Sequence, residues 1–255
     1  MRNLRLIARL DVKMDWLIKG VQMEGWRKVG DPAEFAARYA ELGADELLFM
    51  DVVASLYQRN SLHDIVQRVA GQVFVPMTVG GGIKSADDAK QLLDRGADKV
   101  AINTAATENP TILTEISDRY GAQATVLSIE AMEQSPRNWT AMTDNGRNHT
   151  GRDVVAWAKE GEERGAGEII LTSIGVEGLG KGFDIELVQQ VVDAVRIPVV
   201  AAGGLGGPEH ILELVDQTDA SAAATAQALH WGKTEFDALR AASAESGCYV
   251  RPLAA

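Results

Sequence analysis

Three acidic residues stand where short apolar runs end, a position from which a carboxylate could do chemistry. Asp11 closes the run that starts at Arg5, Glu130 closes the run that starts at Ala124, and Asp51 ends a third run. Two carboxylates that face one pocket can supply a general base and a general acid. Acids at strand ends also cap loops, so their role depends on which other groups reach the same place.

A glycine run follows another apolar segment and is suited to an anion. In the stretch 79–83, which reads VGGGI, the backbone can approach a ligand closely, and its amides precede a helix N-terminus. Asn103 and Thr104 end the next apolar run and add polar donors beside it. These residues together predict a phosphate site, with Gly82 in its backbone cradle.

A second cradle of the same kind is predicted near the end of the chain. Residues 75–97 align without a gap on residues 197–219, an offset of 122 residues. This repeat pairs Gly81 and Gly82 with Gly203 and Gly204, and Gln227 follows the next apolar run. The second cradle keeps its glycines but has few hydroxyl donors.

The elements that position these residues alternate along the whole chain. Short β-rich runs are followed by amphipathic stretches with helix caps and terminal glycines, as in residues 31–43, 85–96 and 234–247. Eight such units in 255 residues favour an α/β fold, a closed (β/α)8 TIM barrel built from two half-barrel repeats and forming a single domain over residues 1–255. A doubly wound open sheet is the alternative. The eight runs start at Arg5, Glu46, Val73, Lys99, Ala124, Glu168, Ile197 and Ala220.

Charged residues begin four of these runs, at the mouth opposite the predicted active face. They are two cations and two anions: Arg5, Lys99, Glu46 and Glu168. In a barrel they would meet around the central axis, where a salt-bridged ring could close the pore. The alternative is that they are solvated residues that add little stability.

Composition excludes several classes of partner and site. Lys+Arg 25 against Asp+Glu 36 gives a net charge of −11, which argues against nucleic acid or an anionic membrane as the main partner. The single cysteine, Cys248, indicates a reducing, cytoplasmic setting, and the charged N-terminal dozen residues are neither a signal nor a membrane span. The four histidines are scattered without ligand spacing, so we expect no metal and no other cofactor.

Several segments in order give the chain a specific resemblance. They are LDVK at residue 10, IKG at 18, TVGGGI at 78, GADKVAINTAA at 96 and GAGEIILTSI at 165. With them the chain resembles the HisF family, the cyclase subunits of imidazole glycerol phosphate synthase. The resemblance implies an enzyme that takes ammonia from a HisH-like glutaminase docked at the N-terminal face of the barrel. It implies that a phosphorylated substrate, a ribulosyl formimino carboxamide ribonucleotide, becomes imidazole glycerol phosphate and a purine-precursor ribonucleotide.

The resemblance also implies roles for individual residues. Asp11 matches an aspartate proposed as general base, and Lys19 lies in a mobile loop that covers the substrate. The residues that match one phosphate site are Gly82, Asn103 and Thr104, and the glycines near the other are Gly178, Gly203 and Gly204. The residues that match an ammonia gate are Arg5, Glu46, Lys99 and Glu168, and Asp98 matches a residue at the glutaminase interface.

The departures from the family gather at the reacting end. Glu130 stands where the family has a catalytic aspartate, and the extra methylene moves the carboxyl group by about 1 Å, a change that can cost about a hundredfold in rate. From the sequence we expect Glu130→Asp to raise cyclase activity or leave it unchanged. The other departures are Glu177 for aspartate, Leu179 for threonine, and Ala202 and Gln227 for serines.

Two other functions therefore stay open. A HisF-like paralogue could deliver ammonia for the amidation of another substrate, such as a nucleotide sugar, and the stretches 21–32 and 50–62 resemble that branch. A non-catalytic barrel could only bind and activate its glutaminase. The presence of Asp11, Lys19, Asn103 and Thr104 counts against this last reading.

Overall fold

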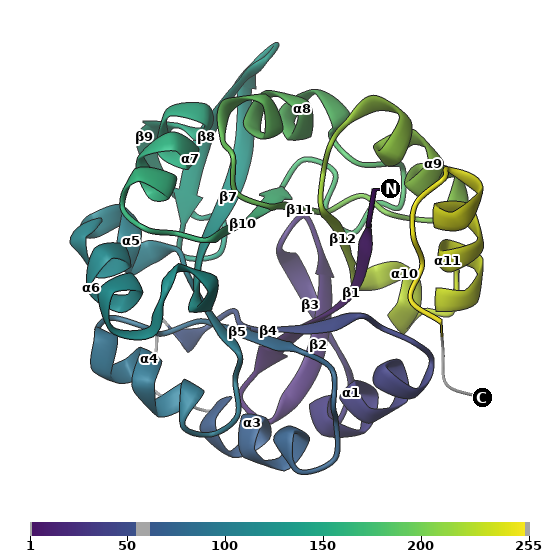
Figure 1. The fold of residues 1–255 in the computed structure, drawn as a ribbon, viewed down its shortest axis with the longest axis horizontal. Helices are drawn as coiled ribbons and strands as arrows, with labels where there is room; N and C mark the ends of the chain where they lie inside the picture. Colours follow the sequence, from purple (N-terminus) through teal and green to yellow (C-terminus); the bar gives the residue numbers. More distant parts are fainter. Residues whose placement is uncertain (1, 55–61, 253–255) are drawn as a thin grey trace.

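The chain folds as a closed parallel barrel surrounded by helices, as the sequence predicts. In the computed structural model, which describes residues 2–54 and 62–252, eight strands follow the order β10-β11-β12-β1-β4-β5-β6-β7, and β7 pairs with β10 to close the ring. Figure 1 looks along the barrel and shows the helices arranged around it. Residues 55–61, part of one stretch that resembles the paralogue branch, lie outside the described residues.

All eight predicted strands are present and parallel to their neighbours in the ring. They are β1 (Arg5–Lys13), β4 (Glu46–Asp51), β5 (Met77–Gly80), β6 (Lys99–Ile102), β7 (Thr125–Ser135), β10 (Glu168–Ser173), β11 (Val199–Ala202) and β12 (Ala222–Thr225). The helical elements of the described residues are α1 (Pro32–Glu41), α3 (Leu62–Ala70), α4 (Ala86–Leu93), α5 (Thr104–Glu108), α6 (Thr111–Tyr120), η1 (Ala122–Ala124), α7 (Val154–Glu163), α8 (Ile185–Ala194), α9 (Pro208–Gln217), α10 (Gln227–His230) and α11 (Phe236–Glu245).

The alternation of side chains along β1 explains how the barrel interior is built. Leu6, Ala8 and Leu10 belong to the large core between the strands and the surrounding helices. Ile7 belongs to a separate cluster of small and branched residues inside the barrel. Because successive strand residues face opposite sides, Arg9 and Asp11 point inward with Ile7.

Two of the helices, α1 and α4, begin at the cap residues that the sequence predicts. Asp31 accepts hydrogen bonds from the backbone N–H groups at the start of α1, and Pro32 occupies its first turn. Ser85 accepts from the backbone N of Asp88 at the start of α4. Such caps satisfy N–H groups that the helix itself leaves unbonded.

The two halves of the barrel repeat each other in structure. β5 and β11 start 122 residues apart, and Gly81, Gly82, Gly203 and Gly204 all have positive φ, so the two glycine turns match. Each half also inserts a hairpin after its first strand: β2 (Trp16–Val21) with β3 (Glu24–Gly30), and β8 (Asn138–Thr143) with β9 (Asn148–Asp153). The segment that contains Lys19, expected only as a loop, thus forms the β2–β3 hairpin.

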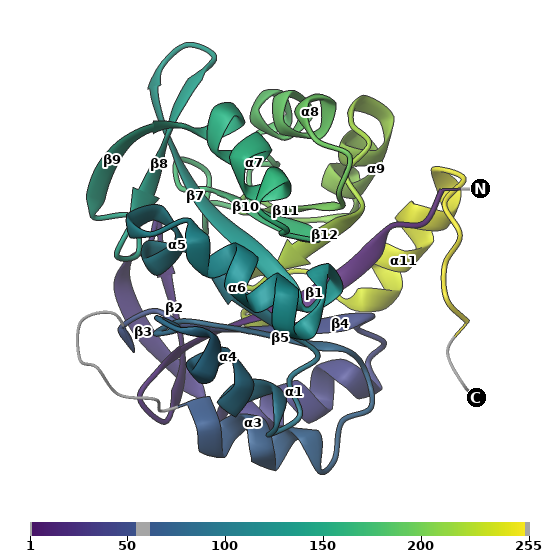
Figure 2. The same cartoon turned by 60° about the vertical axis from the view of Figure 1, so that its left-hand side comes forward.

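These two hairpins extend β1 and β7 beyond the barrel and meet above its mouth. Figure 2 shows both at one end of the molecule, with the two termini at the other. The side chains of Met23, Met142 and Ile174 pack together there, and Nδ2 of Asn145 donates to the carbonyl of Met23 at 3.3 Å. The hairpins therefore form a roof over the carboxyl ends of the strands.

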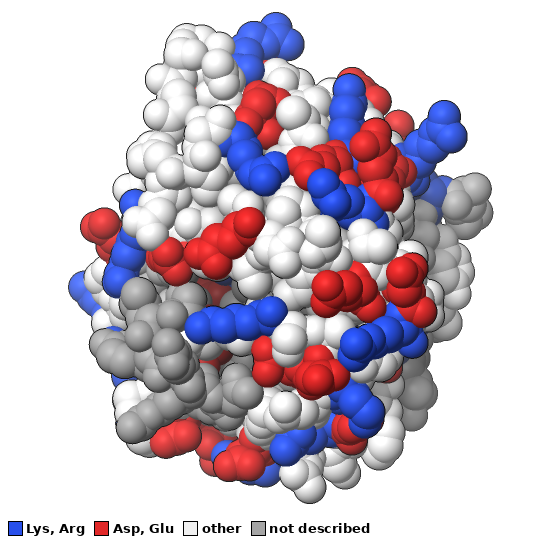
Figure 3. Space-filling view, turned by 90° about the vertical axis from the view of Figure 1, so that its left-hand side faces the viewer, with Lys and Arg blue, Asp and Glu red and all other residues white. Residues whose placement is uncertain are grey.

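The outer surface carries charges of both signs. On the face in Figure 3, Lys and Arg side chains are interspersed with Asp and Glu. Within residues 2–54 and 62–252, no helix is long and apolar enough to cross a membrane.

Candidate active site

Asp11 lies at the centre of the mouth, between two cations. Its Oδ1 accepts from Nε of Arg9 at 2.8 Å, and its Oδ2 accepts from Nζ of Lys19 at 3.1 Å. Lys19 projects from β2 and also pairs with Glu177 of the loop after β10. All four side chains are buried. Lys19 thus ties the first hairpin to the opposite side of the barrel.

The electrostatics of this cluster keep Asp11 ionised. Burial is the largest influence and by itself would raise the pKa of Asp11, but the charges of Arg9 and Lys19 outweigh it and hold this pKa well below its usual range. Burial would likewise lower the pKa of Lys19, and Glu177 and Asp11 raise it instead. Asp11 is therefore a fixed negative charge at neutral pH.

Glu130 faces the same space from β7, four strands around the ring from β1. Its Oε2 accepts a hydrogen bond from the backbone N of Gly146 at 2.7 Å, in the turn of the β8–β9 hairpin. Burial raises the pKa of Glu130 to about 7, against the opposing effects of Gly146 and Arg9. Glu130 can accordingly gain or lose a proton near neutral pH. The sequence suggested that Glu130 ends its strand. In the structure β7 continues past it to Ser135, so Glu130 lies within the strand.

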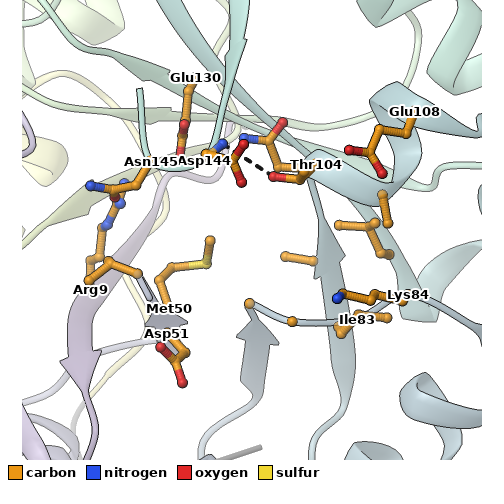
Figure 4. A pocket seen from close by; sticks show the side chains of 17 residues that line it. Arg9, Met50, Asp51, Ile83, Lys84, Thr104, Glu108, Glu130, Asp144 and Asn145 are labelled. Atoms are coloured by element: carbon orange, nitrogen blue, oxygen red, sulfur yellow. Dashed lines mark hydrogen bonds between the residues drawn. The ribbon is translucent and has the colours of Figure 1, made fainter. Parts of the chain in front are cut away.

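A cavity of about 410 Å³ opens beside Glu130, over the ends of β4, β5 and β6. Figure 4 shows Glu130 and Arg9 on one side of it and Lys84 and Glu108 on the other. The predicted site residues that line this cavity are Asp51, Gly82, Asn103, Thr104 and Glu130. The hydroxyl of Thr104 accepts from the backbone N of Asp144 at 3.3 Å, which joins the cavity wall to the second hairpin.

The residues predicted for a second phosphate site line a much smaller void. Its volume is about 10 Å³, room for about one water molecule. The residues that line it are Arg9, Glu177, Gly178, Gly203, Gly204, Leu205, Ala224, Thr225, Ala226 and Gln227. Every residue predicted for this site thus gathers in one place, and Oε1 of Gln227 is buried there without a partner among the described residues.

The four charges at the opposite mouth form a closed ring of ion pairs. Nζ of Lys99 lies 2.9 Å from Oε1 of Glu46 and 2.7 Å from Oε2 of Glu168. Arg5 completes the ring, with Nη1 at 2.7 Å from Oε2 of Glu46 and a second pair to Glu168. Cations and anions therefore alternate around the ring, and each side chain pairs with both of its neighbours. Asp98, predicted at a partner interface, is exposed on this same face and accepts from the backbone N of Met77.

Arg9 is the residue of this site that the sequence analysis missed. It was noted only as a charge that interrupts the apolar N-terminus, yet its side chain is buried in the mouth and lines both cavities. One signal could have found it: Arg9 shares the inward register of Ile7 and Asp11, and the residues between them, Ala8 and Leu10, are apolar.

Comparisons with known proteins agree with this geometry. A family model described as a histidine biosynthesis protein matches residues 5–235. A protein of Legionella pneumophila named imidazole glycerol phosphate synthase subunit HisF is 62% identical over 206 residues, 81% of this chain and 97% of that protein. Proteins of the same name from Myxococcus xanthus and Pyrococcus furiosus are 47% and 46% identical, over 98% and 97% of this chain and 98% of each relative. The chain therefore belongs to this histidine biosynthesis family, as a HisF-type cyclase subunit of imidazole glycerol phosphate synthase.

Proposed function

We propose that this chain uses ammonia to split and cyclise a ribulosyl formimino carboxamide ribonucleotide, with imidazole glycerol phosphate and a purine-precursor ribonucleotide as products. One observation carries the proposal: a single barrel holds a closed ring of ion pairs at one mouth and two carboxylates at the other. The pKa of one carboxylate, Asp11, is lowered, and that of the other, Glu130, is raised to about 7. A gate for a small neutral molecule and an acid–base pair are the two devices that this reaction needs.

The cavity over β4, β5 and β6 supports binding of one phosphoryl end. Gly82 brings bare backbone to its wall, Asn103 and Thr104 add polar side chains, and Lys84 adds a cation. In our proposal Asp51 lines the same end of the substrate. The second phosphoryl end lies toward Gly203, Gly204 and Gln227, and it requires the void there to widen.

The two carboxylates take different parts. Glu130 exchanges protons with the substrate, because its pKa of about 7 lets it act as acid or base near neutral pH. Asp11 stays ionised between Arg9 and Lys19 and stabilises positive charge on the ammonia nitrogen. Lys19 and Glu177 keep the β2–β3 hairpin down over this site while chemistry proceeds.

Ammonia reaches the site from the N-terminal face. A HisH-type glutaminase docks on that face, with Asp98 in the contact, and releases ammonia beneath the ring of Arg5, Glu46, Lys99 and Glu168. Above the ring the barrel interior is lined by small and branched residues, among them Ile7, Ala101 and Ala222. An apolar passage favours neutral ammonia over the ammonium ion, since burying an unpaired charge is costly.

The test supplies the purified chain with an ammonium salt and the ribulosyl formimino carboxamide ribonucleotide. Substrate loss is followed by absorbance, and the products are identified by mass spectrometry. We expect imidazole glycerol phosphate, and a faster rate at higher pH as the share of neutral ammonia rises. Absence of turnover by a chain whose circular dichroism shows an intact fold would contradict the proposal.

A second candidate is amidation of another substrate, such as a nucleotide sugar. The difference in size between the two cavities favours it, because about 10 Å³ at Gly203 and Gly204 accommodates no phosphoryl group without movement, against about 410 Å³ at Gly82. The same assay separates the two functions if nucleotide sugars that bear a carboxylate are offered with ammonium and amide products are sought.

A further inference from the structure

Arg9 occupies the wall between the two cavities of the mouth. Of the residues that the structure describes, it is the one that lines both the 410 Å³ cavity and the small void at Gly203 and Gly204. It is also the only cation among those that line the void. A substrate that spans both cavities passes directly over its guanidinium.

The guanidinium is held rigidly from two sides. Its Nε donates to Asp11 at 2.8 Å and its Nη1 donates to Oγ1 of Thr172, on β10, at 2.9 Å. The first contact lies within β1, the second joins β1 to β10, three strands along the ring, and both partners are buried. A donor fixed in this way needs no reorganisation when a ligand arrives.

Part of the guanidinium remains available for a ligand. An arginine side chain has five N–H donors, and the described residues accept from only two of its nitrogens, Nε and Nη1. Nη2 has no acceptor among the described residues, and it is not a fully buried atom. It therefore borders accessible space. Arginine only donates, so the group that it meets must be an oxygen acceptor.

We propose that Arg9 is a catalytic residue that donates hydrogen bonds to the substrate's ketone oxygen, between the phosphoryl ends, where Asp11 and Glu130 converge. This inference rests on the proposed function. The ribulosyl group is a ketose, and its carbonyl lies between the two phosphoryl groups of the substrate. That placement puts the carbonyl over Arg9 when the ends occupy the two cavities.

The step that Arg9 assists is the addition of ammonia to this carbonyl. The nitrogen lone pair bonds to the carbonyl carbon, and the π electron pair moves to oxygen, which becomes negative. Glu130 in its ionised form takes a proton from the nitrogen and returns it to the oxygen. Later loss of water leaves an imine, so ketone and ammonia are balanced by imine and water. Donors aimed at such an oxygen are each worth about 10²–10³ in kcat.

The experiment compares Arg9→Met and Arg9→Lys with the wild-type chain at saturating ammonium. We expect Arg9→Met to lower kcat about a hundredfold while KM changes by less than about threefold, and Arg9→Lys to lie between. Arg119→Met is the matched control, because Arg119 is an exposed arginine of α6 that pairs with Asp87 outside both cavities. Its loss should leave both kcat and KM within about twofold of the wild-type values.

Arg9→Lys also guards against loss of the fold, since it keeps a positive charge beside Asp11. We expect its thermal midpoint to stay near that of the wild type. A substrate analogue with an alcohol in place of the ketone provides a further readout, because it develops no negative charge. Wild type and Arg9→Lys should bind this analogue with equal affinity, measured by calorimetry.

The outcomes are distinct. Wild-type turnover together with an Arg9→Met variant of unchanged kcat would overturn the role of Arg9 alone. Equal losses of analogue affinity and of kcat in Arg9→Lys would also overturn it, because they would indicate ground-state binding. No turnover by the wild-type chain would overturn the proposed function and this inference with it.

Discussion

Oε2 of Glu130 accepts a hydrogen bond from the backbone N of Gly146 at 2.7 Å. Gly146 lies in the turn of the β8–β9 hairpin with a φ of 77°, a conformation that glycine adopts without strain. The hairpin inserted after β7 therefore positions the carboxylate that its own strand carries.

This contact sets the expectation for Glu130→Asp. A shorter side chain withdraws the carboxyl group from Gly146 by about 1 Å, and such a misplacement can cost about a hundredfold in rate. We therefore expect ammonia-dependent kcat to fall at least tenfold, contrary to the sequence-based expectation of an unchanged or higher rate. Steady-state kinetics measure the change, and an unaltered kcat would show that the contact with Gly146 is dispensable.

Stability should depend on pH through the same residue. The folded pKa of Glu130, about 7, lies above the ordinary glutamate pKa of 4.5, so folding favours the protonated form. Its stabilising influence is complete below about pH 4.5 and is lost as pH rises through about 7, a change of the order of 3 kcal/mol. Glu130→Gln should flatten this fall in urea unfolding between about pH 4.5 and 7, the span of the two pKa values. An identical pH dependence in both proteins would contradict the assignment.

Asp11→Asn should abolish most activity and destabilise the fold. The variant leaves Arg9 and Lys19 buried without their shared anion, and breaking a buried pair costs about 3–5 kcal/mol. Asp15→Asn is the matched control, since Asp15 is exposed in the turn before β2. Thermal unfolding and ammonium-driven turnover check both. Full turnover in Asp11→Asn would exclude a role for this carboxylate.

Arg5→Ala should affect turnover with ammonium salt and turnover with glutamine differently. It opens the ring at Glu46 and Glu168, far from Glu130, so turnover with ammonium salt should stay within about twofold. Turnover with glutamine and a HisH-type glutaminase should drop about tenfold, as ammonia escapes or is protonated. Arg68→Ala, which removes an exposed arginine paired with Asp31, is the control. Equal losses with both sources would argue against a gate.

Gly204→Ala should distort the second void. A Cβ at this position would lie 1.8 Å from the carbonyl oxygen of Gly182, and the φ of 97° is strained for alanine. We expect a loss of about 2 kcal/mol or more in unfolding free energy, together with a higher KM. Gly175→Ala is the matched control, because a Cβ there meets no atom within 4 Å. Equal stabilities of the two variants would show that the loop relaxes freely.

The barrel itself could be predicted from local patterns. The run from Lys99 and the helix cap at Ser85 are signals contained within a few residues, and each appears where it was expected. The pairing of glycine turns at Gly82 and Gly204 followed from an internal repeat that the sequence carries openly. Even the alanine-rich run from Ala220 became β12, because its neighbours in the ring supply the pairing.

The site was harder to predict, since its chemistry depends on distant partners. Asp11 and Glu130 were singled out because they end apolar runs, and the ring residues because they begin them. The conversion of the expected loop after β1 into the β2–β3 hairpin depends on contacts with the second hairpin, such as that of Met23 with Met142. No local pattern encodes such a contact.

The sequence by itself determined the alternation of strands and helices, the glycine cradles and the charges that face the barrel axis. Only the tertiary structure decided that Arg9 sits against Asp11 and Thr172, that Lys19 reaches Glu177, and that the pKa of Glu130 lies near neutral pH. The physical reason is that burial and through-space charge set these properties. Lys19 and Glu177 are 158 residues apart in the chain, and only closure of the barrel brings them together.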